Sequence, residues 1–148
     1  MHPTHPHLPE GMRTGDERMD STHDGFMDLM QTLRDTPPTE RLPAYDALVR
    51  HTEAHFAQEE QWMAELGLPP QNCHAGQHAN VLETLHEVGK RARQGDLGLI
   101  ERMLDALDEW FALHVVAMDS ALADALRAHA AAQPEAARAR SSVLSTLP

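Results

Sequence analysis

The apolar residues of this 148-residue chain recur at steps of three and four, the spacing of side chains on one face of an α-helix. The second of four such segments keeps strict steps of 4, 3, 4, 3 and 4 residues through Leu48, Thr52, His55, Glu59, Trp62 and Leu66. No segment alternates apolar and polar residues at a period of two, as a half-buried strand would. The chain is therefore expected to be all-α.

Clusters of Pro, Gly and other turn residues separate the helical segments, at 36–39, 67–72, 94–96 and 133–134. Asn72 precedes the third segment and is expected to cap its N-terminus. Short connections between long helices predict an up-down-up-down antiparallel four-helix bundle, with neighbouring axes about 10 Å apart. We expect this bundle over residues 17–132, after an irregular His/Pro-rich N-terminal arm (1–16) and before a C-terminal tail (133–148).

Charge and cysteine content exclude several classes of partner. The chain has 23 acidic against 12 basic residues, a formal net charge of −11, which disfavours binding to nucleic acid or to an anionic membrane. Neither a membrane span nor a signal peptide is visible, so a soluble cytoplasmic protein is expected, and its mixed charged faces favour a monomer. The single cysteine, Cys73, excludes an internal disulfide and leaves nitrogen and oxygen as metal ligands.

Polar side chains occupy positions of the apolar stripes where leucine would pack better. His55 and Glu59 do so in the second segment, His74 and His78 in the third, and single histidines, His23 and His114, in the first and fourth. An unpaired buried carboxylate costs several kcal/mol, and a buried imidazole needs partners for both of its nitrogens. Residues four apart share a helix face, so each pair can reach one ion or two adjacent ions. A buried metal site is the simplest partner for all of these groups.

Spacing alone leaves alternatives open. Each pair by itself also fits a surface position or a hydrogen-bonded core position. Asp119 follows His114 by five residues, a rotation of about 140° on an ideal helix, so it fits a solvated carboxylate as well as a ligand. Glu60 lies about 100° around the helix from Glu59 and is expected to be a surface charge. His51 is expected to lie behind the ligands rather than among them.

Four features together resemble a known family: His23 and the runs HFAQE at 55–59, HAGQH at 74–78 and WFALHVVAMD at 110–119. In order and interval they resemble the ligand motifs of hemerythrins and bacteriohemerythrins. The resemblance implies a non-haem di-iron site with an oxo or hydroxo bridge inside a four-helix bundle. It implies five terminal ligands (His23, His55, His74, His78 and His114) and two bridging carboxylates (Glu59 and Asp119).

Two octahedral irons offer about twelve ligand positions, and the implied ligands and bridge fill all but one. One open position suits reversible binding of a small diatomic molecule better than it suits an enzyme. The resemblance implies that this molecule is dioxygen, bound for storage, transport or delivery. Oxygen or redox sensing, or a di-iron enzyme acting on peroxide or nitric oxide, is the alternative. The aromatic residues near the ligand motifs are expected to pack in the core and to exclude water: Phe26, Phe56, Trp62, Trp110 and Phe111. The arm lacks the tryptophan usual in bacterial members, so its packing is not predicted.

Overall fold

The computed structural model describes residues 8–133, and these residues form helices without any strand. The long helices are α1 (Glu17–Asp35), α2 (Arg41–Glu65), α3 (Cys73–Arg93) and α4 (Gly98–His114). A π-helical turn, η3 (Val115–Asp119), joins α4 to α5 (Ser120–Ala132) without a break in the rod. Two short 3-10 turns, η1 (Glu10–Met12) and η2 (Pro38–Glu40), precede α1 and α2. The all-α prediction is confirmed.

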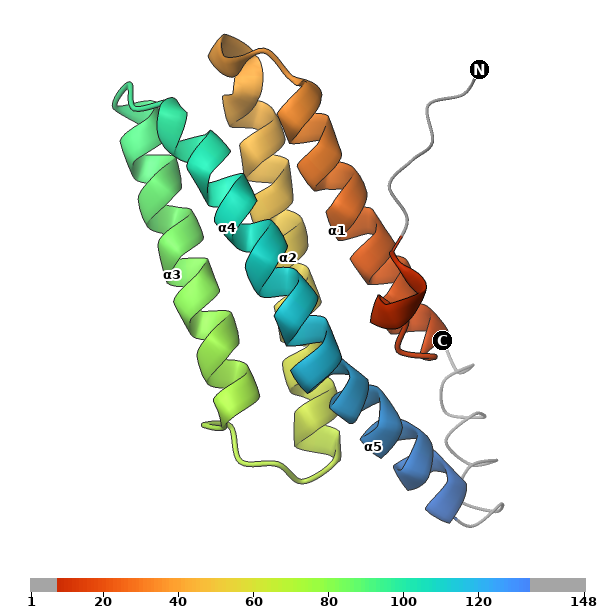
Figure 1. Cartoon of the computed structure of the whole chain (residues 1–148). Helices are drawn as coiled ribbons and strands as arrows, with labels where there is room; N and C mark the ends of the chain where they lie inside the picture. The colour runs from red at the N-terminus through yellow and green to blue at the C-terminus, as the bar shows by residue number, and fades with distance from the viewer. Residues whose placement is uncertain (1–7, 134–148) are drawn as a thin grey trace, which may run out of the picture.

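The four long helices form the predicted antiparallel bundle. Helix α1 packs against α2, α2 against α3, α3 against α4, and α4 against α1, which closes the ring. Figure 1 shows successive helices running in opposite directions, with the connections at alternate ends of the bundle. Within the described part of the chain, no helix is long and apolar enough to span a membrane.

Local sequence sets the helix ends. The Asn72 side chain accepts a hydrogen bond from the Ala75 amide, which confirms the predicted cap of α3. Asp16 caps α1 in the same way by accepting from the Met19 amide. Gly67 follows α2 with a φ of +83°, a backbone conformation that side chains with a Cβ rarely adopt.

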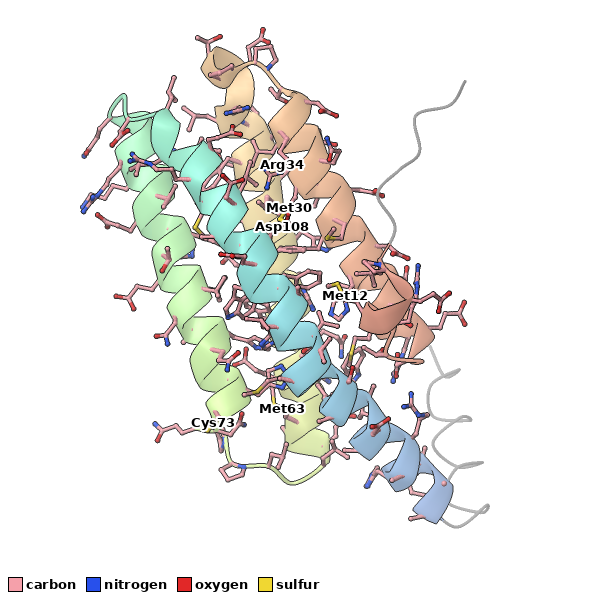
Figure 2. All side chains as sticks on the ribbon, in the orientation of Figure 1. Met12, Met30, Arg34, Met63, Cys73 and Asp108 are labelled. Atoms are coloured by element: carbon pink, nitrogen blue, oxygen red, sulfur yellow. The ribbon has the colours of Figure 1, made fainter. Side chains whose placement is uncertain are left out.

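Two apolar clusters fill the bundle, one on each side of a polar layer. The polar layer consists of seven buried side chains: His23, His55, Glu59, His74, His78, His114 and Asp119. The larger cluster packs the half of the bundle that holds the α1–α2 and α3–α4 connections, and it includes Met30, Leu48, Leu85, Ile100 and Leu104. The smaller cluster packs the other half and consists of Met19, Trp62, Met63, Leu122 and Ala123. Figure 2 labels Met30 and Met63 toward opposite ends of the bundle. The polar layer between the clusters is therefore shielded along the bundle axis in both directions.

The described part of the N-terminal arm, residues 8–16, is docked on the bundle. Leu8 is buried in the larger cluster, and Met12 packs against it. Asp20 of α1 accepts hydrogen bonds from the amide and hydroxyl of Thr14 and from the amide of Gly15. Turn η1 contacts η3, so the arm reaches the junction of α4 and α5 as well as α1. The rest of the arm, residues 1–7, and the tail from residue 134 lie outside the described residues.

Candidate metal centre

All seven predicted ligand side chains meet in the polar layer. The most exposed of them, His74, is 8% exposed, and the carboxylates of Glu59 and Asp119 are completely buried. They come from all four rods of the bundle: His23 from α1, His55 and Glu59 from α2, His74 and His78 from α3, His114 from α4, and Asp119 from η3. Side chains separated by up to 96 residues in the chain therefore meet at one point.

Three imidazoles surround a pair of carboxylate oxygens, one from Glu59 and one from Asp119. Glu59 Oε1 lies 3.2 Å from His74 Nε2 and 3.3 Å from His78 Nε2. Asp119 Oδ1 lies 2.9 Å from His74 Nε2 and 3.1 Å from His114 Nε2. We call these three nitrogens and two oxygens the three-histidine cluster.

The other carboxylate oxygens face the remaining two imidazoles. Glu59 Oε2 lies 2.6 Å from His55 Nε2 and 3.5 Å from His23 Nε2, and Asp119 Oδ2 lies 3.1 Å from His23 Nε2. These two nitrogens and two oxygens are the two-histidine cluster. Glu59 and Asp119 thus each give one oxygen to each cluster, which is how a carboxylate bridges two adjacent ions.

The π turn η3 resolves the position of Asp119 that spacing left open. The Ser120 amide donates to the Val115 carbonyl, a hydrogen bond that spans five residues instead of four. The wider turn returns Asp119 to the face of the rod that carries His114. Met118, which an ideal helix would align better with His114, is only half-buried.

The buried carboxylates impose a positive charge on the layer. Burial by itself would lower the pKa of His23 and His74, but the carboxylates of Asp119 and Glu59 outweigh it and raise the pKa of each to about 9. Burial by itself would raise the pKa of Asp119, yet the adjacent imidazoles of His114, His23 and His74 lower it to about 2. The surrounding imidazoles likewise hold the pKa of Glu59 well below its usual range. Two ionised carboxylates thus share a dry site that requires cations.

Several atoms directed into the layer have no hydrogen-bond partner among the described residues. They are Glu59 Oε1, His78 Nε2 and both carboxylate oxygens of Asp119. Buried polar atoms are rarely left without a partner, and metal bound in both clusters would satisfy all four. Imidazole nitrogen and carboxylate oxygen are ligands that iron accepts. The residues present therefore fit a metal centre.

Two residues that the motifs did not nominate contact the outer nitrogens of this layer. Glu60 is exposed, as predicted, but its Oε2 lies 3.3 Å from His78 Nδ1. Gln77 Oε1 lies 2.8 Å from His114 Nδ1. Each follows or precedes a proposed ligand directly in the chain, on the flank that faces the neighbouring helix. The position next to a proposed ligand was the only sign in the sequence that Glu60 and Gln77 would contact the layer.

His51 is half-buried and lies outside both clusters, as predicted. Its Nε2 donates to the Thr22 carbonyl at 3.0 Å, and the absence of a side chain at Gly25 makes room for its ring. Burial lowers the pKa of His51, which keeps the imidazole neutral. His51 thus links α2 to α1 beside the site.

Four of the five predicted aromatic neighbours contact imidazoles of the layer. Phe56 stacks on His78 with ring centroids 3.9 Å apart, and Phe111 meets the edge of His23 at 5.1 Å. Trp110 lies over His114, and Phe26 lies near His55. Trp62 packs instead in the smaller apolar cluster, with the Arg18 guanidinium 4.6 Å from its ring centroid.

Two adjoining clusters of imidazole and carboxylate donors in a four-helix bundle define a helical non-haem metal protein. The family model described as "Hemerythrin HHE cation binding domain" matches residues 14–126. A Bacteriohemerythrin of Ralstonia nicotianae is 41% identical over 110 residues, which are 74% of this chain and 80% of that relative. A Bacteriohemerythrin of Stenotrophomonas maltophilia is 31% identical over 84 residues, 57% of this chain and 54% of that relative. The chain belongs to the hemerythrin family, and the family and the donor layer together indicate non-haem iron binding.

Proposed function

We propose that this protein binds dioxygen reversibly at a non-haem di-iron site, for oxygen storage, transport or delivery. The observation that carries the proposal is the division of both carboxylates between two histidine clusters. Five donors face one position and four face the other, as two ions with shared Glu59 and Asp119 bridges require. The proposed terminal ligands are His23, His55, His74, His78 and His114.

The unequal donor counts support one open position. An octahedral ion has six positions, so one shared oxo or hydroxo bridge would complete the three-histidine cluster and leave the two-histidine cluster one short. A di-iron centre with such a position supplies the electrons for reversible binding of dioxygen. The protein's own part is to hold the ligands, to keep the site dry and to leave that position accessible.

The surroundings favour binding over turnover. The rings that contact the imidazoles of the two-histidine cluster include Phe26 and Phe111, which are buried and cannot transfer protons. The apolar clusters on both sides of the layer exclude water in the same way. We therefore propose an oxygen-binding protein rather than an enzyme. The metal-binding unit would be residues 17–132, with 1–16 as an arm and 133–148 as a tail. The cytoplasmic location and monomeric state remain predictions.

Metal analysis and reversible oxygenation test the proposal together. We expect about two irons per chain, since both clusters would be filled. Anaerobic reduction followed by air should produce a visible and near-ultraviolet charge-transfer band that disappears under vacuum. Glu59→Gln should lower the iron content and abolish the band, whereas Glu53→Gln, on the exposed side of α2, should preserve both.

Three outcomes would contradict it. One iron per chain, or zinc in its place, would remove the di-iron assignment. Irreversible bleaching on the first exposure to air would instead support a di-iron enzyme or a redox sensor.

A further inference from the structure

The two clusters differ in what holds the outer nitrogen, Nδ1, of their imidazoles. We propose that the three-histidine cluster is the preorganised half of the centre and takes the first metal ion, with Glu60 as the positioning residue that orients His78. This inference rests on the two-metal site of the proposed function and adds an order of filling and a residue that controls it.

Glu60 fixes both the tautomer and the orientation of His78. A carboxylate only accepts hydrogen bonds, so His78 Nδ1, 3.3 Å from Glu60 Oε2, carries the proton. The lone pair of the neutral ring is then on Nε2, which lies 3.3 Å from Glu59 Oε1 inside the cluster. Phe56 stacks on the same ring with an interplanar angle of 4°. The ring is thus held in the position and tautomer that a metal ligand needs before any ion arrives.

Gln77 does the same for His114. Its Oε1 accepts from His114 Nδ1 at 2.8 Å, which leaves the lone pair on Nε2. Trp110 stacks on the ring with an interplanar angle of 20°. Two of the three imidazoles in this cluster are therefore oriented by partners on neighbouring helices.

The two-histidine cluster lacks such partners. Nδ1 of His23 and Nδ1 of His55 are both buried and have no hydrogen-bond partner within residues 8–133. Each ring would have to carry its proton on that unpaired nitrogen in order to bind metal through Nε2, which costs free energy. This cluster also offers four donors instead of five. Both differences favour filling of the three-histidine cluster first.

The order has a consequence for function. A chain with one ion would hold it among His74, His78 and His114, while the cluster with the open position would be empty. The binding of dioxygen would then depend on how readily the second, weaker position is filled. Metal supply, and not only oxygen pressure, would control the fraction of active protein.

Titration of the metal-free full-length protein with Co²⁺, followed by visible absorption, tests the order without any oxygenation assay. We expect two separate steps, of which the first is the tighter. His55→Ala should retain the first step and lose the second, whereas His78→Ala should weaken the first. Far-ultraviolet circular dichroism of each metal-free variant would establish that it has folded.

Variants of Glu60 test the positioning role. Glu60→Ala should weaken the first step by about 10- to 100-fold, the range for loss of an outer partner of a metal-binding histidine. Glu60→Gln keeps an accepting oxygen and should recover part of that loss. Glu53→Ala removes the same charge from an exposed position of α2, two turns away, and should leave both steps unchanged.

The failures are distinguishable. Binding of only one Co²⁺ would refute the two-metal site and the proposed function with it. Binding of two Co²⁺ in a single step, or loss of both steps in His55→Ala, would refute the order but not the function. Equal effects of Glu60→Ala and Glu53→Ala would refute the positioning role.

Discussion

His114 Nε2 and Asp119 Oδ1 lie 3.1 Å apart although Asp119 is five positions after His114 in the chain. The π turn brings them together, because its hydrogen bonds close over five residues rather than four. An extra residue is accommodated within the rod, and the helix continues as α5 beyond it.

Changes in the length of this turn should affect metal binding unequally. Deletion of Ala117, which is exposed, would convert the turn to a regular α-helix with the carboxylate four residues after His114, still on the same face. We expect the deletion variant to retain metal. Insertion of one alanine after Ala117 would swing Asp119 away by about 100° and should lower the metal content sharply. Metal per chain and helical content measure both effects, and equal loss in the two variants would contradict the role of the turn.

Trp110 should protect the oxygenated form of the protein. Its indole lies over His114 with ring centroids 4.3 Å apart and is only half-buried, so it separates that imidazole from solvent. Trp110→Ala, or Phe111→Ala, should admit water and accelerate loss of the oxygenated form several-fold. The decay of its absorption band gives the rate. Leu113→Ala shortens a side chain that is 74% exposed on the same helix and serves as the control, and an unchanged rate in Trp110→Ala would count against protection.

Tyr45 should make the fold sensitive to alkaline pH. Burial raises the pKa of its hydroxyl well above the usual value of 10.0, and the hydroxyl donates to the Leu85 carbonyl at 2.5 Å. Above pH 10 the unfolded chain loses this proton and the folded chain keeps it. The free energy of unfolding should therefore fall by about 1.4 kcal/mol per pH unit from this group, until the folded pKa is reached.

Comparison with Tyr45→Phe isolates that contribution, since the variant lacks the ionisable group. Tyr45 is the single tyrosine of the chain, so phenolate absorption reports on it alone. Ionisation of the folded protein near pH 10, or the same pH slope in both proteins, would show the prediction to be wrong.

Asp20 should anchor the N-terminal arm. Its buried carboxylate accepts three hydrogen bonds from Thr14 and Gly15. Asp20→Ala leaves these donors unpaired and should lower the free energy of unfolding by about 1–3 kcal/mol. Hydrogen exchange of the Thr14 and Gly15 amides should accelerate, whereas the exposed neighbour Glu17 can be changed to Gln without that effect. Unchanged exchange at both amides would contradict the anchoring role.

Helical spacing predicted much of the site because burial follows it closely. The steps of three and four residues placed His55 and Glu59 inward, and the structure buries both. The same rule could not decide whether Asp119 faces inward or outward. It assumes 3.6 residues per turn, and a π turn has more residues per turn than that. Only the combined ligand motif, compared with a family, pointed to that carboxylate.

Side-chain reach explains what spacing missed at Glu60. Spacing correctly predicted that Glu60 lies on the outer side of α2, where it is exposed. A glutamate is long enough, however, to extend along the contact between α2 and α3 and to meet His78 Nδ1. Gln77 crosses from α3 to α4 in a similar way. Such contacts depend on the separation of two helices, which the pattern along one helix does not contain.

The shared carboxylates also determine how the metal ions would cross-link the chain. The three-histidine cluster ties α2, α3, α4 and η3, whereas the two-histidine cluster ties α1 to α2 and η3. Helix α1 contributes one ligand, His23, and closes the longest loop, from residue 23 to residue 119. Closing a longer loop costs more chain entropy, so the bond to His23 restrains the unfolded chain most. The second ion would thus cross-link α1 to the rest of the bundle, and its removal would break that link.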